Sequence, residues 1–98
     1  MSYASGIGSI AIGGNSTAQG NCATGTCSIA IGFDSKSSAD AAVALGQGVT
    51  AAKADTVTVK ELETCVAGGG VIMTTPDGTA QYKITVDNSG NLVSTLVV

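Results

Sequence analysis

Histidine and tryptophan are absent from this sequence of 98 residues, and its aromatic side chains are limited to Tyr3, Phe33 and Tyr82. The absence of histidine removes the usual general base of enzymes. No Walker loop, G-x-S-x-G turn or helical metal-binding motif is present either. We therefore expect no enzymatic activity, no cofactor and no metal site.

Positive charge is also scarce, because the only cationic side chains are four dispersed lysines and the net charge is −3. Such a chain lacks the basic surface of a nucleic-acid-binding protein. No apolar run is as long as a membrane helix, and the opening "MSYASGIG" has no basic start or long apolar stretch of a secretory signal. We expect neither nucleic-acid binding nor membrane insertion.

The cysteines are odd in number, namely Cys22, Cys27 and Cys65. They fit no zinc pattern, since the C-x4-C pair has neither a second pair nor a histidine. Small buried hydrophobes are the simpler interpretation. A Cys22–Cys27 disulfide is the alternative, because the two residues flank a predicted insertion, so the redox state stays open.

What the chain does contain is one small apolar phrase written four times. "SIAIG" begins at Ser9 and Ser28, "AVALG" at Ala42 and "TVTVK" at Thr56, so the last two spacings are equal and the first is longer by five. In each copy two aliphatic residues stand two positions apart, a period typical of a β-strand. These eight residues, which we expect to form the structural core, are Ile10, Ile12, Ile29, Ile31, Val43, Leu45, Val57 and Val59.

A second set of alternating residues follows seven, nine and eleven positions after each phrase begins, and predicts a second short strand in each unit. Its members are Ser16, Ala18 and Gly20, then Ser35, Ser37 and Ala39, then Val49, Ala51 and Lys53. With this alignment the five surplus residues of the longer first unit fall in "NCATGTC", between Gly20 and Ser28.

Each repeat is fourteen residues long and holds two strands. This pattern predicts a flattened solenoid in which successive coils stack about 4.8 Å apart with equivalent residues in register. The aliphatic columns then form continuous ladders. Neither face of such a strand is charged, so both faces need cover. We expect identical chains in a closed symmetric assembly to provide part of it.

After Val59 the repeat stops. Residues 60–70 predict a neck or linker that ends in three glycines, and residues 71–98 predict three antiparallel strands joined by turns at "PDG" and "DNSG". Tyr82, Ile84 and Val86 would share one face. Because an isolated sheet of this size is marginal, we expect it to pack against copies of itself.

Weaker motifs have simpler explanations. "GIGSIA" and "GQGVTA" match a loose dinucleotide fingerprint, but both arise from the repeat. "DNSGN" lacks the carboxylate that closes a calcium loop. A pair of catalytic carboxylates is not excluded by the sequence. Ice binding by a flat β-solenoid is a further alternative, although the threonines do not fall in a single column.

Three stretches closely resemble the head repeats of trimeric autotransporter adhesins, the YadA-like head, whose phrase is approximately N-S-V-A-I-G-x-x-S. They are "SIAIGGNSTAQG", "SIAIGFDSKSSADA" and "AVALGQGVTAAKADTVTV", within about residues 2–59. The resemblance implies an all-β fold, a left-handed parallel β-roll of three chains intertwined in an obligate homotrimer. It also implies adhesion to host matrix such as collagen through a repeated surface.

The family's phrase is only partly kept. Its opening Asn is Gly8 and Cys27 here, its first Ser is kept at Ser9 and Ser28, and its later Ser is kept at Ser16 and Ser35 but is Val49 in the third copy.

Residues 74–98 look like the short C-terminal β modules that end viral and phage fibres, and no coiled-coil stalk or membrane anchor is visible. We therefore predict the head or tip of a virion fibre or spike at the virion surface, binding a host-surface protein or glycan. The alternative is a fragment of a bacterial adhesin at the cell surface. The turn residues expected to make contacts are Asn15, Phe33, Asp34, Lys36 and Gln47.

Overall fold

The computed structural model describes residues 2–14 and 20–97, and these residues form strands and turns with no helix. The expectation of an all-β protein is therefore confirmed. The chain divides into two compact units between Leu62 and Glu63, and each is described by itself.

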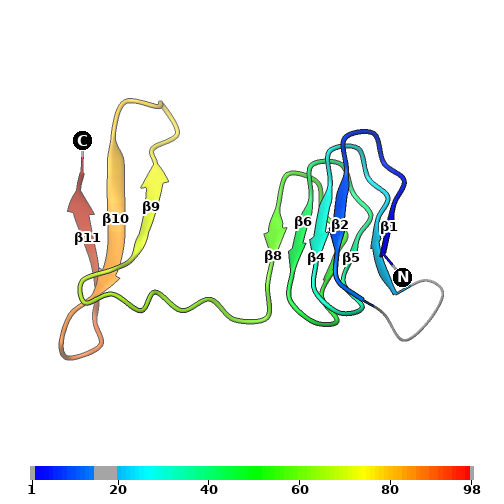
Figure 1. The fold of residues 1–98 in the computed structure, drawn as a ribbon. Helices are drawn as coiled ribbons and strands as arrows, with labels where there is room; N and C mark the ends of the chain where they lie inside the picture. Colours follow the sequence, from blue (N-terminus) through cyan, green and yellow to red (C-terminus); the bar gives the residue numbers. More distant parts are fainter. Residues whose placement is uncertain (1, 15–19, 98) are drawn as a thin grey trace. The chain divides into compact units, whose positions relative to one another are not determined.

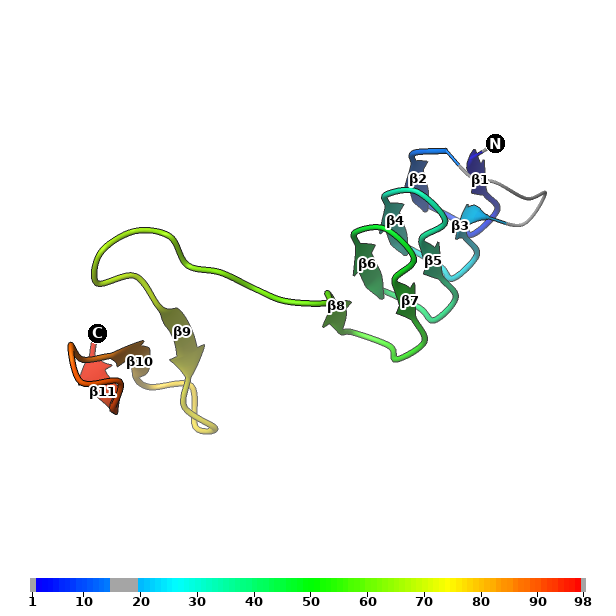
Figure 2. The ribbon, with the colours of Figure 1, turned by 90° about the horizontal axis from the view of Figure 1, so that it is seen from below.

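The first unit is a parallel β-roll of short strands arranged in two sheets (Figure 1). One sheet has the order β1-β3-β5-β7 and the other β2-β4-β6-β8, so the chain crosses from one sheet to the other after every strand (Figure 2). The strands are β1 (Ser2–Ala4), β2 (Ile10–Ile12), β3 (Asn21–Ala23), β4 (Ile29–Ile31), β5 (Lys36–Ser37), β6 (Val43–Leu45), β7 (Thr50–Ala51) and β8 (Val57–Thr58).

The register of these strands follows the sequence repeat. Ile29 pairs with Val43 and Val43 with Val57, one repeat length further along the chain in each case. Ile10 pairs with Ile29, so the pairing also spans the longer first unit. Equivalent residues therefore stack in columns, as the solenoid prediction requires.

The position of the insertion differs from the prediction. The strand that follows Ile12 is Asn21–Ala23, in which Cys22 pairs with Lys36 and Ala23 with Ser37. The five surplus residues thus lie before this strand, between Ile12 and Asn21, and not in "NCATGTC". The column assigned to Ser16, Ala18 and Gly20 is occupied instead by Asn21, Ala23 and Gly25.

Very small side chains fill the space between the two sheets. The fully buried residues include Ala30 and Ala44 of the first strand of each coil, and Ala23, Ser37 and Ala51 of the second. Hydroxyl groups among them join the layers, because Ser37 Oγ donates to the Ala42 carbonyl at 2.8 Å and Ser28 Oγ to the Ser37 carbonyl at 3.3 Å. The space between the two sheets is consequently narrow, and among the described residues Val49 is the only aliphatic side chain larger than alanine that is buried there.

The second unit is the expected antiparallel sheet, with the order β11-β10-β9. In the central strand, Tyr82 pairs with Met73 on one side and Leu96 on the other. No side chain of residues 60–97 is buried, so this unit has no interior of its own. Its strands are β9 (Val71–Thr74), β10 (Gln81–Val86) and β11 (Leu92–Leu96).

Candidate functional site

The most prominent surface of the roll is an aliphatic face on the outside of the sheet β2-β4-β6-β8. Ile10, Ile29, Val43 and Val57 form one column of it. Ile12, Ile31 and Leu45 form a second, and Val59 follows the end of β8. We call these eight residues the aliphatic ladder.

The aliphatic ladder is not the interior of the single chain, which corrects the expectation that it forms the core. Exposed fractions reach 56% at Ile12 and 59% at Val57, and they are 38% at both Ile31 and Leu45. Ile29, Val43 and Val59 are half-buried. Because alternate residues of a strand point to opposite faces, the residues between them face inward, with Ala30 and Ala44 fully buried, and the ladder faces outward. Burial of the ladder in an assembly stays a prediction.

Phe33, Asp34 and Gln47 lie in stacked turns that join the two sheets. The Phe33 ring lies beside Gly14 of the preceding coil, and Phe33 itself is 44% exposed. Its carbonyl accepts a hydrogen bond from the Gly48 amide at 2.8 Å, and the Asp34 amide donates to the Gly14 carbonyl at 3.1 Å. These turns are therefore held in register by backbone contacts while the Phe33 ring remains partly accessible.

Lys36 and Asn15 are placed differently from the other predicted contact residues. Lys36 is not in a turn: it lies in β5 and points outward from the second sheet, in a column with Tyr3, Cys22 and Thr50. Asn15 lies outside the described residues. The predicted contacts thus share no pocket, and those described are spread over a ridge of turns and the neighbouring sheet face.

The threonines of the roll form no continuous column among the described residues. Thr50 aligns with Lys36 and Cys22, and Thr58 aligns with Ala44. The flat threonine face that an ice-binding solenoid requires is therefore missing from this part of the chain.

Asn21 is a structural residue that the sequence analysis did not single out. It is fully buried where the insertion rejoins the roll. Its amide nitrogen lies 2.5 Å from the Gly32 carbonyl, 2.6 Å from Ser35 Oγ and 3.2 Å from the Ile12 carbonyl. An asparagine amide can bridge the two sheets in this way, whereas the hydroxyl of the equivalent residue in the next coil, Ser35, donates within its own turn to the Gly32 carbonyl. The sequence carries no signal for this role, because Asn21 stands within a run of small residues that alternates equally well in two registers.

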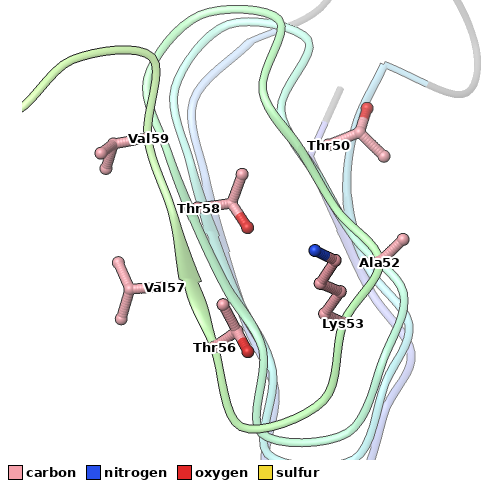
Figure 3. A pocket seen from close by; sticks show the side chains of 7 residues that line it. All are labelled: Thr50, Ala52, Lys53, Thr56, Val57, Thr58 and Val59. Carbon is pink, nitrogen blue, oxygen red and sulfur yellow. The ribbon is translucent and has the colours of Figure 1, made fainter.

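A pocket of about 350 Å³ opens at the last coil of the roll (Figure 3). This pocket is the open end of the space between the two sheets. The coil that contains β7 and β8 is the last of the roll, so no further coil covers it. Thr58 occupies the column that Ala44 fills in the coil before. The Lys53 side chain extends into the same space, and Val57 and Val59 point away from it (Figure 3). The remaining lining residues are Thr50, Ala52 and Thr56.

Two aspartates of the C-terminal sheet have low pKa values because of the turns they hold. Asp77 Oδ1 accepts hydrogen bonds from the Thr79 amide and from the hydroxyls of Thr75 and Thr79, which lowers its pKa to about 2. The Asn91 amide, the Asn91 side chain and the Ser89 amide lower the pKa of Asp87 in the same way. Both carboxylates thus accept hydrogen bonds that close reverse turns.

The cysteines and carboxylates do not gather into a reactive site. Cys22 and Cys27 are not joined by a disulfide. Within residues 2–14 and 20–97, no group of three His, Cys, Asp or Glu side chains is placed to hold a metal ion. The same residues include no helix long and apolar enough to cross a membrane.

Comparison with known families identifies the repeats of the roll. Residues 4–21 and 23–48 match the family model of the YadA head domain repeat, in two copies. This part of the chain is therefore similar to YadA heads. The stacking continues beyond the matched residues into β7 and β8. Neither the curated proteins nor the solved structures include a significant match to the chain.

Proposed function

We propose that the chain is a non-enzymatic attachment module, in which three copies of the roll wind in a left-handed sense and pack through their aliphatic ladders. The observation that carries the proposal is the outward ladder itself. Eight aliphatic side chains lie on one face of a repeat similar to YadA heads, and five of them are at least 38% exposed.

The energetics of the single chain favour such an assembly. The interior of the roll holds almost only alanine and serine, and its largest fully buried side chain is Asn21. Burial of a Val, Leu or Ile side chain stabilises by roughly 1.5–3 kcal/mol, so the exposed ladder leaves much of the available hydrophobic free energy unused. Three identical faces meeting at a three-fold axis would recover it, and closed symmetry would limit the assembly to a trimer.

Attachment would rely on the turns, because the assembly would cover the ladder. Phe33 is the best single contact residue, since its partly exposed ring projects from a ridge where its neighbours are Gly14 and Gln47. Asp34, Lys36 and Gln47 complete the described part of the candidate surface, and Asn15 stays a prediction from the sequence. Three copies of a weak site on one rigid body raise avidity without a deep pocket, and a host-surface protein or glycan is the expected partner.

We place this module at the tip of a virion fibre or spike, with the surface of a bacterial cell as the alternative. The virion is favoured because the roll is followed by a small antiparallel sheet, and residues 60–70 form no helix that would start a coiled-coil stalk. The genes next to this one distinguish the two locations: capsid genes support the virion, and an outer-membrane anchor supports the bacterium.

The mass of the native particle tests the proposal directly. Native mass spectrometry and sedimentation of the full chain at micromolar concentration should give three times the chain mass. A stable, folded monomer would contradict both the assembly and the avidity mechanism. Loss of attachment to cells or matrix after Phe33→Ala, with the trimer mass unchanged, would identify the contact residue.

A further inference from the structure

One face of the C-terminal sheet is apolar and has no cover. Tyr82 pairs with Met73 and Leu96, Ile84 with Val71 and Ser94, and Val86 with Leu92, and directly opposed residues lie on the same face. Seven of these eight side chains are large and apolar. Exposed fractions are 55% at Met73, 60% at Leu96 and 79% at Leu92. We call this set, Val71, Met73, Tyr82, Ile84, Val86, Leu92, Ser94 and Leu96, the apolar face.

The opposite face of the same sheet is mostly polar. Lys83 pairs there with Ile72 and Thr95, Thr85 with Val93, and Gln81 with Thr74, so five of these seven side chains are polar and the exceptions are Ile72 and Val93. The only lysine of the sheet and most of its threonines thus lie on one side, while the other side has no charged residue. A two-sided sheet of this kind is built to be covered on one side and wet on the other.

The sheet cannot depend on its own contacts for stability. None of its residues is buried, and three strands in a single layer need a covered hydrophobic face to be stable in water. The expected occupant must be apolar and uncharged, because the apolar face offers no partner for a charge. The same face of another copy meets both conditions.

We propose that the apolar face docks against the apolar faces of the other copies in the assembly, so that the C-terminal sheet is an association unit separate from the roll. The inference rests on the proposed trimer for the number of copies. A chain already joined to its partners through the roll holds its C-terminal sheet near theirs, at an effective concentration on the order of millimolar for a short linker. Only a weak intrinsic affinity between the three apolar faces is then needed for them to dock.

A matched pair of variants in the full chain tests the docking. Ile84→Lys places a charge on the apolar face, and Thr85→Lys places the same charge one residue away on the polar face. Amide hydrogen exchange of residues 81–86 in the purified protein should accelerate by on the order of tenfold or more in Ile84→Lys, and little in Thr85→Lys. Equal exchange in the two variants would overturn the inference, because a lysine on an uncovered face disturbs nothing.

A distance measurement identifies the occupant. Spin labels are attached at Ser94→Cys on the apolar face or Thr95→Cys on the polar face, in a chain whose Cys22, Cys27 and Cys65 are replaced by serine. The inter-chain distances should be shorter and more narrowly distributed for the label at 94 than for the label at 95. Equal distances in a protein of trimer mass overturn this inference and leave the proposed function intact. A monomer mass for the unmodified chain overturns the proposed function first.

Discussion

At the scale of single residues, one backbone position recurs before every copy of the repeated phrase. Gly8, Cys27, Ala41 and Asp55 have φ angles of 69°, 56°, 54° and 58°. The left-handed region is reached most easily by glycine and asparagine. Glycine therefore suits position 8 with little strain, and Cys27, Ala41 and Asp55 hold the same conformation at a cost.

Replacing Ala41 by glycine should therefore stabilise the roll. The left-handed conformation costs an L-residue roughly 1–2 kcal/mol, and the added freedom of glycine in the unfolded chain takes back roughly 0.4–1 kcal/mol. We expect a rise in the free energy of unfolding of up to about 1.6 kcal/mol for Ala41→Gly, measured by denaturant titration. The control is Ala42→Gly at the next residue, which is fully buried. This variant should lower the free energy of unfolding. Destabilisation by both variants would contradict this account.

Asn21 gives a second prediction at this scale. Asn21→Ala removes the amide that donates to the Ile12 and Gly32 carbonyls, although the Gly32 amide still donates to the first and the Ser35 hydroxyl to the second. The expected loss in the free energy of unfolding is therefore that of ordinary hydrogen bonds, roughly 0.5–1.5 kcal/mol. Asn21→Ser should cost less, because serine occupies the equivalent position at Ser35. If the two variants unfold at the same denaturant concentration, the bridge has no energetic importance.

At the scale of elements, the constant repeat length and the period of two were enough to predict the strands and most of their register. They could not locate the insertion, because Ser16-Ala18-Gly20 and Asn21-Ala23-Gly25 both alternate small residues, and only stacking against the next coil distinguishes them. Alternation also could not tell which face is inside. That depends on the distance between the sheets, a space filled mostly by alanine and serine, together with Asn21 and Val49. The turn residue Phe33 was predictable as a lone aromatic, whereas Lys36 was misplaced by one element.

The stacking of coils through their turn glycines can be tested with two equivalent positions. A Cβ atom at Gly32 would lie 2.6 Å from the Gly46 carbonyl carbon, whereas one at Gly46 would meet only Val49 Cγ2, at 3.4 Å. The φ angles are 131° and 117°, so the backbone strain is similar in the two variants. Gly32→Ala should therefore lower the free energy of unfolding by roughly 1–3 kcal/mol more than Gly46→Ala. Equal thermal midpoints in the two variants would show that neighbouring coils move apart to accept the extra methyl group at position 32 without losing stability.

The turns of the C-terminal sheet should make it sensitive to acid. Asp77 has a pKa of about 2 in the folded sheet against an ordinary value of 3.8. Because the folded value is the lower one, the stabilisation is complete above about pH 4 and is lost as the pH falls towards 2. Carbon-detected NMR titration of the Asp77 carboxyl should show the low pKa. Asp77→Asn should weaken the dependence of sheet stability on pH in this window, and an unchanged dependence would exclude the mechanism.

At the scale of the whole molecule, both units have the same deficiency. The roll buries mostly alanine and serine, with Asn21 and Val49 as its largest buried side chains, and the C-terminal sheet buries none. Many of the large apolar residues lie instead on two exposed faces, the aliphatic ladder and the apolar face, and others such as Ile7, Leu62 and Val66 are exposed elsewhere. A fold whose large apolar side chains lie mostly on exposed faces gains stability when other copies of the chain cover those faces. Loss of assembly should therefore also lower the stability of the fold.

The aliphatic ladder allows that coupling to be tested. Leu45 points outward beside Ile31 and is 38% exposed in the single chain, so a lysine there clashes with nothing in one copy. At a three-fold interface, Leu45→Lys would bring three like charges into an apolar contact without partners, which is strongly unfavourable. We expect the variant to lose the trimer mass in sedimentation experiments. Thr50→Lys, outward on the opposite sheet, should retain it, and Leu45→Val should retain it with a lower melting temperature. A trimer of undiminished stability in Leu45→Lys would show that the ladder is not the surface through which the chains associate.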